Sequence, residues 1–272
     1  MRLAQTPIIQ KIMSHSSTRQ SQILGMLQTK GECSIDYFAE KFGTSGMTIR
    51  RDLQELADQG RIIRTHGGAT TAPGITFEFA FLKRTKLNML QKQAIGQLAA
   101  SLIKDNQSVV LDSGTTTLAI AKLLRYRKGV KVITTSLPIA SMLQYNESIE
   151  INLLGGQLRA GSPDLCGAIT EANLDLICAD LAFVGADAID TRGTVFTEFS
   201  ELSRMLARMI ANAKTSYVVA DSSKLNRTTL WRFGELKQMG GLITDGKADT
   251  SFVNNLTKAG IKVLRAPRHG RP

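Results

Sequence analysis

The chain has 272 residues, 43% of them hydrophobic, which is enough for two domains that each bury a core. Its net charge of +11 suits a polyanionic partner, yet residues 1–72 hold nine Lys or Arg against six Asp or Glu. That is +3, which leaves +8 for the remainder, so bulk charge indicates solubility and nonspecific attraction rather than a function. Three widely spaced cysteines without CxxC spacing and three scattered histidines argue against a zinc site.

Membrane and secretory signals are not recognisable in the sequence. No apolar run approaches the roughly 20 residues of a membrane span, and residues 1–17 lack a signal-peptide core. Free thiols in an ordinary globular composition are typical of the reducing cytoplasm. We expect a cytoplasmic protein with no membrane contact, no metal and no cofactor, preceded by a loose N-terminal extension over residues 1–17.

Two amphipathic helices are predicted next in the chain. Ile23, Leu24 and Leu27 share one face of a helix within residues 18–29. The second helix has its apolar positions at helical spacing, and Gly43 then supplies a turn. Its apolar residues are Ile35, Phe38, Ala39 and Phe42.

A third helix is predicted within residues 44–60, capped by Ser45 and ended by Gly60. Ile49, Leu53 and Leu56 fall at i, i+4 and i+7, so they form one buried stripe. The other side has the residue types that bind phosphates and guanine edges, which makes this a candidate DNA-recognition helix. The candidate contacts are Ser45, Met47, Thr48, Arg50, Arg51 and Gln54.

A β-wing is predicted after this helix, over residues 61–69. Two isoleucines favour a strand, two glycines allow a sharp bend, and Arg64 and His66 add polar candidates for DNA contact. An amphipathic helix with two arginines is more often a solvated surface helix. The order helix, helix, turn, helix and wing instead indicates a winged helix-turn-helix domain over residues 18–72.

The second domain is predicted to be a doubly wound, mostly parallel α/β fold. Residues 70–76 contain Pro73-Gly74 and mark the boundary, so we assign 73–90 to a linker and lead-in, 91–266 to the domain and 267–272 to a tail. Apolar runs alternate with helical stretches, which is typical of a parallel sheet covered on both faces. The predicted strands are 109–111, 130–133, 149–154, 181–184, 217–220, 241–243 and 261–264, and the predicted helices are 91–104, 116–125, 137–145, 172–178, 198–213 and 250–259.

Small polar residues follow five consecutive strands of this predicted sheet. The carboxyl ends of parallel strands form the ligand crevice of such folds. Asp112-Ser-Gly-Thr-Thr-Thr117 also opens a helix, whose N–H groups and dipole favour a phosphate. One such turn is ordinarily a structural cap, but five in order favour a shared site for an anion and hydroxyls. The turns are 112–117, 134–136, 155–156, 185–190 and 221–224.

The sequence resembles the DeoR family of bacterial transcriptional regulators over roughly residues 18–265. The resemblance is carried by Thr48-Ile-Arg-Arg-Asp-Leu53 and by Gly60-Arg-Ile-Ile-Arg-Thr-His-Gly-Gly-Ala69. It implies a winged helix-turn-helix before a sugar-phosphate sensor related in fold to ribose-5-phosphate isomerase and the sugar-phosphate deaminases. It also implies a homodimer or homotetramer that binds double-stranded operator DNA.

The same resemblance implies the residues of the sensor site. Arg84, Lys92 and Lys224 match positive positions around the ligand, and Lys224 within Asp-Ser-Ser-Lys is the best supported. Asp187 and Asp221 are available for sugar hydroxyls, with Glu198 as a weaker candidate. The phosphorylated sugar is expected at the turn that Asp112 begins and at the next two strand ends, involving Gly114, Thr115, Thr116, Thr135, Ser136, Gly155 and Gly156.

Three functions remain to be weighed. The leading hypothesis is a repressor of carbohydrate-utilisation genes, not an enzyme, that a sugar phosphate releases from DNA by a population shift. The alternative is a sugar-phosphate isomerase or deaminase, with Asp112 or Asp187 as general base and Lys224 stabilising an enediolate oxygen. A third is a sugar-phosphate binder without DNA activity. Both alternatives leave the recognition helix and the wing unexplained.

Overall fold

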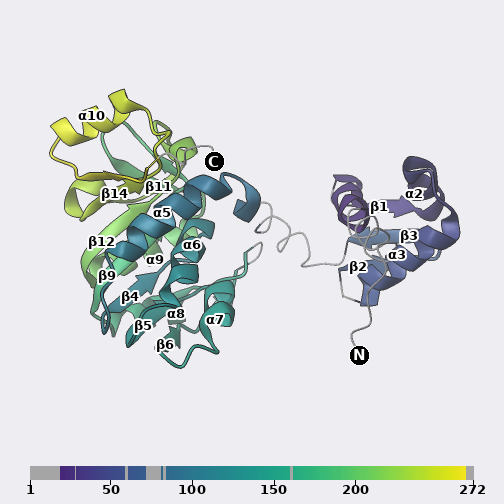
Figure 1. Ribbon diagram of the computed structural model, residues 1–272, viewed down its shortest axis with the longest axis horizontal. Coiled ribbons are helices and arrows are strands. Elements are labelled where there is room, and N and C mark those ends of the chain that lie inside the picture. Colours follow the sequence, from purple (N-terminus) through teal and green to yellow (C-terminus); the bar gives the residue numbers. More distant parts are fainter. Residues whose placement is uncertain are drawn as a thin grey trace, which may run out of the picture. The chain divides into compact units, whose positions relative to one another are not determined.

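A computed structural model describes residues 19–27, 29–58, 61–71, 81, 84–159 and 162–267. The chain divides into two compact units, Met1–Ala80 and Phe81–Pro272, and Figure 1 shows both. The expected extension at 1–17, the helix end at Gly60 and the boundary turn Pro73-Gly74 lie outside the described residues. Within the described ranges, no helix is both long enough and apolar enough to cross a bilayer.

The first unit has the predicted order of helix, helix, turn, helix and wing. Residues 19–27 are helical, and a three-stranded antiparallel sheet has the order β1-β3-β2, in which β1 was not predicted. Gly43 adopts the left-handed conformation, with φ of 57°, that ends α2. The elements are β1 Glu32–Ser34, α2 Ile35–Phe42, α3 Gly46–Asp58, β2 Ile62–Arg64 and β3 Gly68–Thr71.

The core of this unit forms where the predicted apolar stripes meet. Ile49, Leu53 and Leu56 of α3 are completely buried, and they pack in one cluster with Leu27 and Phe38. Burial of each such side chain contributes roughly 1.5 to 3 kcal/mol. The predicted stripe of the third helix is therefore confirmed, and it leaves the opposite face of α3 for other contacts.

A buried ion pair also fixes α3. Asp52, only 3% exposed, accepts hydrogen bonds from the guanidinium of Arg19 at Nε and Nη2, at 2.5 and 3.1 Å. Asp52 belongs to the Arg-Arg-Asp sequence of the candidate recognition helix. Its role in this unit is to join α3 to the first helix, whereas the two arginines before it point outward.

The wing packs tightly against β1 at one glycine. Gly68 lies opposite Ser34 in the β1–β3 register. A Cβ atom at Gly68 would lie 2.1 Å from the Cys33 carbonyl oxygen and 2.8 Å from the Ser34 Cα. Glycine is therefore required for the close approach of the two backbones.

The second unit is built on a seven-stranded, entirely parallel sheet with the order β15-β14-β12-β9-β4-β5-β6. The strand order reverses between β4 and β9, so the topological switch point lies between these two strands. All seven predicted strands are confirmed. They are β4 Ser108–Leu111, β5 Val130–Thr134, β6 Ile149–Leu153, β9 Ala179–Gly185, β12 Ala213–Val219, β14 Gly241–Thr244 and β15 Val263–Arg265.

Helices cover both faces of this sheet, which gives two separate cores (Figure 1). One core joins Val109, Leu111 and Phe183 of the strands to α5 Met89–Ser101, α6 Thr115–Leu124 and α7 Leu137–Leu143. The other core joins the opposite strand faces to three further helices. These are α8 Ala168–Asp175, α9 Ser200–Ala211 and α10 Thr250–Lys258. The doubly wound fold is confirmed.

The starting ends of three central strands are tied together by one carboxylate. Asp180 Oδ2 on β9 accepts hydrogen bonds from the N–H and hydroxyl of Ser108 on β4, both at 2.9 Å. Lys214 Nζ on β12 donates to Asp180 Oδ1 at 2.8 Å. These hydrogen bonds lower the pKa of Asp180 to about 2, with that from Lys214 the largest cause.

Several short elements were not predicted. An antiparallel sheet has the order β10-β11-β13, and a hairpin pairs β7 with β8. The predicted helix over 198–213 extends too far, because α9 ends at Ala211 and Ala213 already begins β12. The unpredicted elements are β7 Gln157–Leu158, β8 Leu165–Cys166, β10 Ala188–Ile189, β11 Thr194–Thr197, β13 Trp231–Glu235 and the 3-10 helices η1 Ser222–Lys224 and η2 Leu236–Gln238.

Candidate functional site

The exposed face of α3 carries most of the predicted DNA contacts. Met47 is 72% exposed, and Arg50, Arg51 and Gln54 are also exposed. Arg51 Nε forms an ion pair with Glu55 Oε1 at 3.3 Å one turn further along. Because this pair is open to solvent, it holds the guanidinium weakly, which leaves Arg51 able to exchange Glu55 for a phosphate or a base edge.

The remaining candidates join the start of α3 and the wing to this face. Ser45 Oγ accepts a hydrogen bond from Thr48 N at 3.2 Å, as predicted for a cap, and lies 3.0 Å from Thr48 Oγ1. Arg64 on the wing donates to the side-chain oxygen of Gln54, so the structure brings these two candidates together. His66 is exposed in the turn between β2 and β3.

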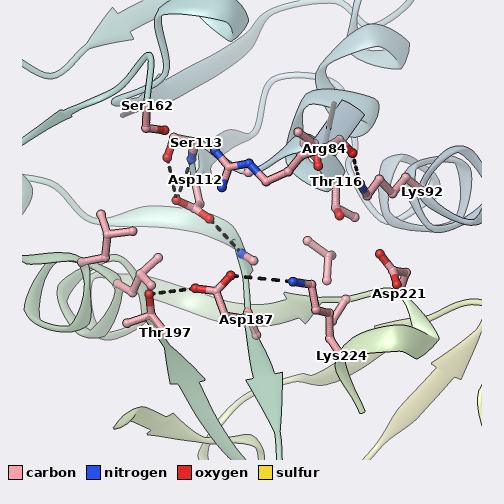
Figure 2. Close-up of a pocket in the computed structure, with 18 of the residues that line it drawn as sticks. Arg84, Lys92, Asp112, Ser113, Thr116, Ser162, Asp187, Thr197, Asp221 and Lys224 are labelled. Carbon is pink, nitrogen blue, oxygen red and sulfur yellow. Dashed lines mark hydrogen bonds and ion pairs between the residues drawn. The ribbon is translucent and has the colours of Figure 1, made fainter. Parts of the chain in front are cut away.

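The second unit contains a cavity of about 480 Å³ at the carboxyl ends of β4, β9 and β12. It therefore lies at the switch point of the sheet, where the fold predicts a ligand. Figure 2 shows charged side chains that face each other across it. The predicted site residues that line it are Arg84, Lys92, Asp112, Gly114, Thr115, Thr116, Asp187, Asp221 and Lys224.

The turn between β4 and α6 forms one wall of the cavity. Gly114 is the N-cap of α6 and provides no side-chain cap, so the first N–H groups of the helix have no intrahelical acceptor. Asp112 is buried and accepts hydrogen bonds from Gly185 N at 3.0 Å and Ser113 N at 2.6 Å. Burial raises the pKa of Asp112 to about 6, against the effect of these N–H donors.

Lys92 is a buried cation in the wall formed by α5. Its Nζ donates to the carbonyl oxygens of Arg84 and Leu87, the latter at 2.8 Å. Burial lowers the pKa of Lys92. A lysine whose ammonium is held by neutral carbonyls gains more from an anionic ligand than a solvated surface lysine does.

The opposite wall presents a carboxylate and a second lysine, from the ends of β9 and β12. Lys224 Nζ lies 3.8 Å from Asp187 Oδ1, and Asp187 also accepts hydrogen bonds from Thr197 Oγ1 at 3.1 Å and Glu198 N at 3.0 Å (Figure 2). Asp187 is thus oriented by two hydrogen bonds and one ion pair, and Lys224 is positioned beside the open space. A phosphate and a hydroxyl-bearing chain would find both charge signs here.

Several lining residues were not predicted from the sequence. The clearest is Arg159, which donates to both oxygens of the fully buried Asp164 at 3.1 Å each and lies 4.8 Å from the Phe199 ring centre. Arg159 follows β7, an element too short to be recognised from its pattern. The other lining residues outside the predicted turns are Phe81, Leu87, Asn88, Ser162, Thr197, Phe199, Leu202, Leu206, Val219, Ala220 and Arg227, whereas Ser113, Gly185, Ala186 and Ser223 belong to those turns.

Two of the predicted strand ends do not reach the cavity lining. The segment after β6 folds over the ends of β5 and β6: Leu165 N donates to the Thr135 carbonyl at 3.0 Å, and Ser136 pairs with Asp164 in an isolated bridge. Ser136 Oγ accepts a hydrogen bond from Ile139 N as the cap of α7. The predicted residues outside the lining are Thr135, Ser136, Gly155, Gly156 and Glu198, of which Glu198 supplies its backbone N–H to Asp187.

Comparison with known proteins gives two matches to families within this chain. Residues 19–73 match a DeoR-like helix-turn-helix domain, and residues 87–246 match a DeoR C terminal sensor domain. The chain therefore belongs to the DeoR family of DNA-binding transcriptional regulators.

The relatives below align with this chain over almost their whole length. The chain is 34% identical to the HTH-type transcriptional repressor GlcR of Bacillus subtilis, covering 92% of this chain and 96% of the relative. It is 30% identical to the glycerol-3-phosphate regulon repressor of Escherichia coli, covering 90% and 97%. A solved ribose 5-phosphate isomerase A from Methanocaldococcus jannaschii aligns at 23% identity and a TM-score of 0.38, covering 51% of this chain and 55% of that one.

Proposed function

We propose that this DeoR-family regulator is a repressor of carbohydrate-utilisation genes, and that a sugar phosphate in the cavity releases it from its operator. The observation that carries the proposal is the cavity itself. The uncapped N-terminus of α6 opens into it beside Lys92 and Lys224, while Asp187 and Asp221 also line it. Helix N–H groups and ammonium ions favour a phosphate, and carboxylates accept hydrogen bonds from hydroxyls.

The size and walls of the cavity support the same class of ligand. A volume of about 480 Å³ lies within the range, roughly 300 to 1,000 Å³, that encloses small molecules. Apolar walls from Phe81, Phe199 and Leu202 can pack against carbon atoms of a sugar. The E. coli relative is named as the repressor of a glycerol-3-phosphate regulon, which agrees with a phosphorylated ligand.

The first unit supports operator binding through α3 in the major groove and the wing beside it. The buried stripe and the Arg19–Asp52 pair fix α3, so Arg50 and Arg51 extend from a rigid helix. Operators with two symmetric half-sites require at least a dimer, so we propose a homodimer or homotetramer in the cytoplasm. We propose ligand binding without turnover, and no cofactor or metal.

A thermal-shift measurement is the first test of which sugar phosphate the protein binds. Ribose 5-phosphate, glucose 6-phosphate, fructose 6-phosphate and glycerol 3-phosphate are added to the full-length protein, and each is compared with inorganic phosphate. A ligand that raises the melting temperature should also release a DNA fragment that the protein selects from a random pool. Failure of every sugar phosphate to release that DNA would contradict the effector proposal. Turnover of any of them, lost in Lys224→Ala, would instead support an enzyme.

Two variants separate the functions of the two units. Arg51→Ala should weaken DNA binding by about 1 to 3 kcal/mol if Arg51 contacts a base, with unchanged sugar-phosphate affinity. Lys224→Ala should lower the affinity for the sugar phosphate at least tenfold, which is roughly the contribution of one charged hydrogen bond. It should leave the DNA affinity unchanged. Lys258→Ala, at the exposed end of α10, is the control for charge removal and should change neither.

A further inference from the structure

Residues 84–88 form one wall of the cavity and lie close to the boundary between the two units. Arg84, Leu87 and Asn88 all line the cavity, and the second unit begins only a few residues earlier, at Phe81. The chain that leaves this segment toward the N-terminus leads to the DNA-binding unit. This wall of the cavity is therefore covalently continuous with the DNA-binding unit.

Asn88 holds this segment in an unusual backbone conformation. It is left-handed, with φ of 53°, a region that non-glycine residues rarely adopt. Asn88 also occupies the N-cap position of α5, yet its side chain makes no cap hydrogen bond. Its amide instead donates across the cavity wall to Asp221 Oδ1 at 3.0 Å and to Ser223 Oγ at 3.2 Å, on the turn after β12.

Lys92 makes the second tie to the same segment. Its ammonium donates to the carbonyl oxygens of Arg84 and Leu87, at the two ends of the turn before α5. Strained conformations at functional sites persist where surrounding contacts hold them. Here the contacts that hold the segment come from Asp221 and Lys92, and both of these side chains also face the cavity (Figure 2).

A ligand and residues 84–88 therefore compete for the same atoms. Asp221 Oδ1 already accepts hydrogen bonds from the Asn88 amide and from the N–H and hydroxyl of Ser223, so a sugar hydroxyl that donates to this oxygen competes with Asn88. A phosphate likewise competes with the two carbonyl oxygens for the Lys92 ammonium. The competition follows from the donor and acceptor chemistry of these groups. A ligand that uses these atoms would weaken the contacts that stabilise the left-handed Asn88.

We propose that residues 84–88 transmit occupancy of the cavity to the DNA-binding unit, and that Asn88 is the positioning residue that holds them in the operator-binding arrangement. This inference rests on the proposed function. By linkage, a change that weakens the hold must lower operator affinity and raise effector affinity. A residue that merely contacts the ligand would change effector affinity in the opposite direction.

Asn88→Gly tests this hold in the full-length protein. Glycine accepts the left-handed conformation without strain, so Asn88→Gly keeps this backbone conformation accessible while it removes the contacts to Asp221 and Ser223. The matched control is Asn106→Gly. Asn106 is exposed, has φ of 64° and lies just before β4, at the end of that strand opposite the cavity. The probes are the DNA selected by the wild-type protein and, among the four sugar phosphates named above, the one with the largest thermal shift.

The expected result is a pair of opposite changes. Asn88→Gly should bind the DNA on the order of tenfold more weakly and the sugar phosphate on the order of tenfold more tightly. Ser223→Ala, which removes one acceptor of the Asn88 amide, should give smaller changes in the same two directions. Amide exchange of residues 84–92 should become faster in Asn88→Gly, whereas Asn106→Gly should match the wild type in both affinities.

Two outcomes would overturn the inference while the proposed function stands. In one, Asn88→Gly weakens sugar-phosphate binding and keeps its DNA affinity, which would make Asn88 a simple ligand contact. In the other, Asn88→Gly and Ser223→Ala lower the affinities for DNA and for sugar phosphate and also lower the melting temperature, which would make the contact purely structural. A wild-type protein whose DNA is released by none of the sugar phosphates would overturn both proposals.

Discussion

Gly68→Ala should disrupt the attachment of the wing, and its cost can be worked out from the structure. The added Cβ would lie 2.1 Å from the Cys33 carbonyl oxygen, about 1.3 Å closer than the 3.4 Å at which ordinary contact begins. The neighbouring atoms belong to the backbone of β1, so no side-chain rotation relieves the overlap. β3 must therefore move away from β1.

This movement of β3 breaks its backbone hydrogen bonds to β1. The β1–β3 register joins Glu32 to Thr70, Cys33 to Ala69 and Ser34 to Gly68. Loss of the ladder bonds nearest the overlap, at about 1 kcal/mol each, together with the strain of overpacking gives roughly 2 to 4 kcal/mol. That is a large part of the stability of a small unit, for which about 0.05 to 0.15 kcal/mol per residue is typical.

Hydrogen exchange of the full-length protein, followed by mass spectrometry, measures this cost within the first unit alone. Gly67→Ala is the matched control, because a Cβ at that neighbouring position meets nothing within 4 Å. Gly68→Ala should accelerate exchange across residues 32–71 and abolish DNA binding, with unchanged thermal shift by sugar phosphate. Protection within about 0.5 kcal/mol of Gly67→Ala would refute the steric argument.

Two further predictions concern ion pairs of different burial. Asp52→Ala should destabilise the first unit by roughly 3 kcal/mol, because it leaves the Arg19 guanidinium without its buried carboxylate, whereas Glu55→Ala at the exposed pair should cost under about 1 kcal/mol. Equal exchange rates in these two variants would contradict this ranking. Because the pKa of Asp180 is lowered in the folded protein, this carboxylate stabilises the fold at pH values above its ordinary pKa of 3.8. The stabilisation is lost as the pH falls toward about 2. Lys214→Met should therefore reduce stability to urea only slightly at pH 7, since Lys214 is largely exposed, and the difference from wild type should shrink below pH 4. A difference that stays constant from pH 7 to pH 3 would argue against this role of the pair.

The elements predicted correctly are those whose burial leaves a continuous pattern. The strands of the parallel sheet are covered on both faces, so each is a short apolar run. The strands of the small antiparallel sheet lack that signal: β13 begins with two exposed residues, Trp231 and Arg232, and its fourth residue is a glycine. The β7–β8 hairpin has only two residues in each strand. Local sequence carries too little information to define such elements.

The sequence predicted the cavity at three strand ends and missed a contact that depends on long-range packing. The turns after β4, β9 and β12 line it, as expected from the position of small polar residues after strands. The ends of β5 and β6 are covered by the segment that carries Asp164, which no local pattern reveals. Asn88 was missed for the same reason, because its partner Asp221 is 133 residues away in the chain.

The two ends of the parallel sheet differ in what a substitution there can change. At the starting ends, Asp180 joins β9 to β4 and β12, so a substitution alters how the strands are held together. At the carboxyl ends, the turns beyond β4, β9 and β12 carry the cavity side chains, and apart from Asp112, which bonds to Phe183 and Gly185, their lining side chains lie outside the strand registers. Selection or engineering can therefore exchange one ligand for another by replacing residues in these turns, with the scaffold kept intact. The sheet separates the evolution of ligand choice from the maintenance of the fold.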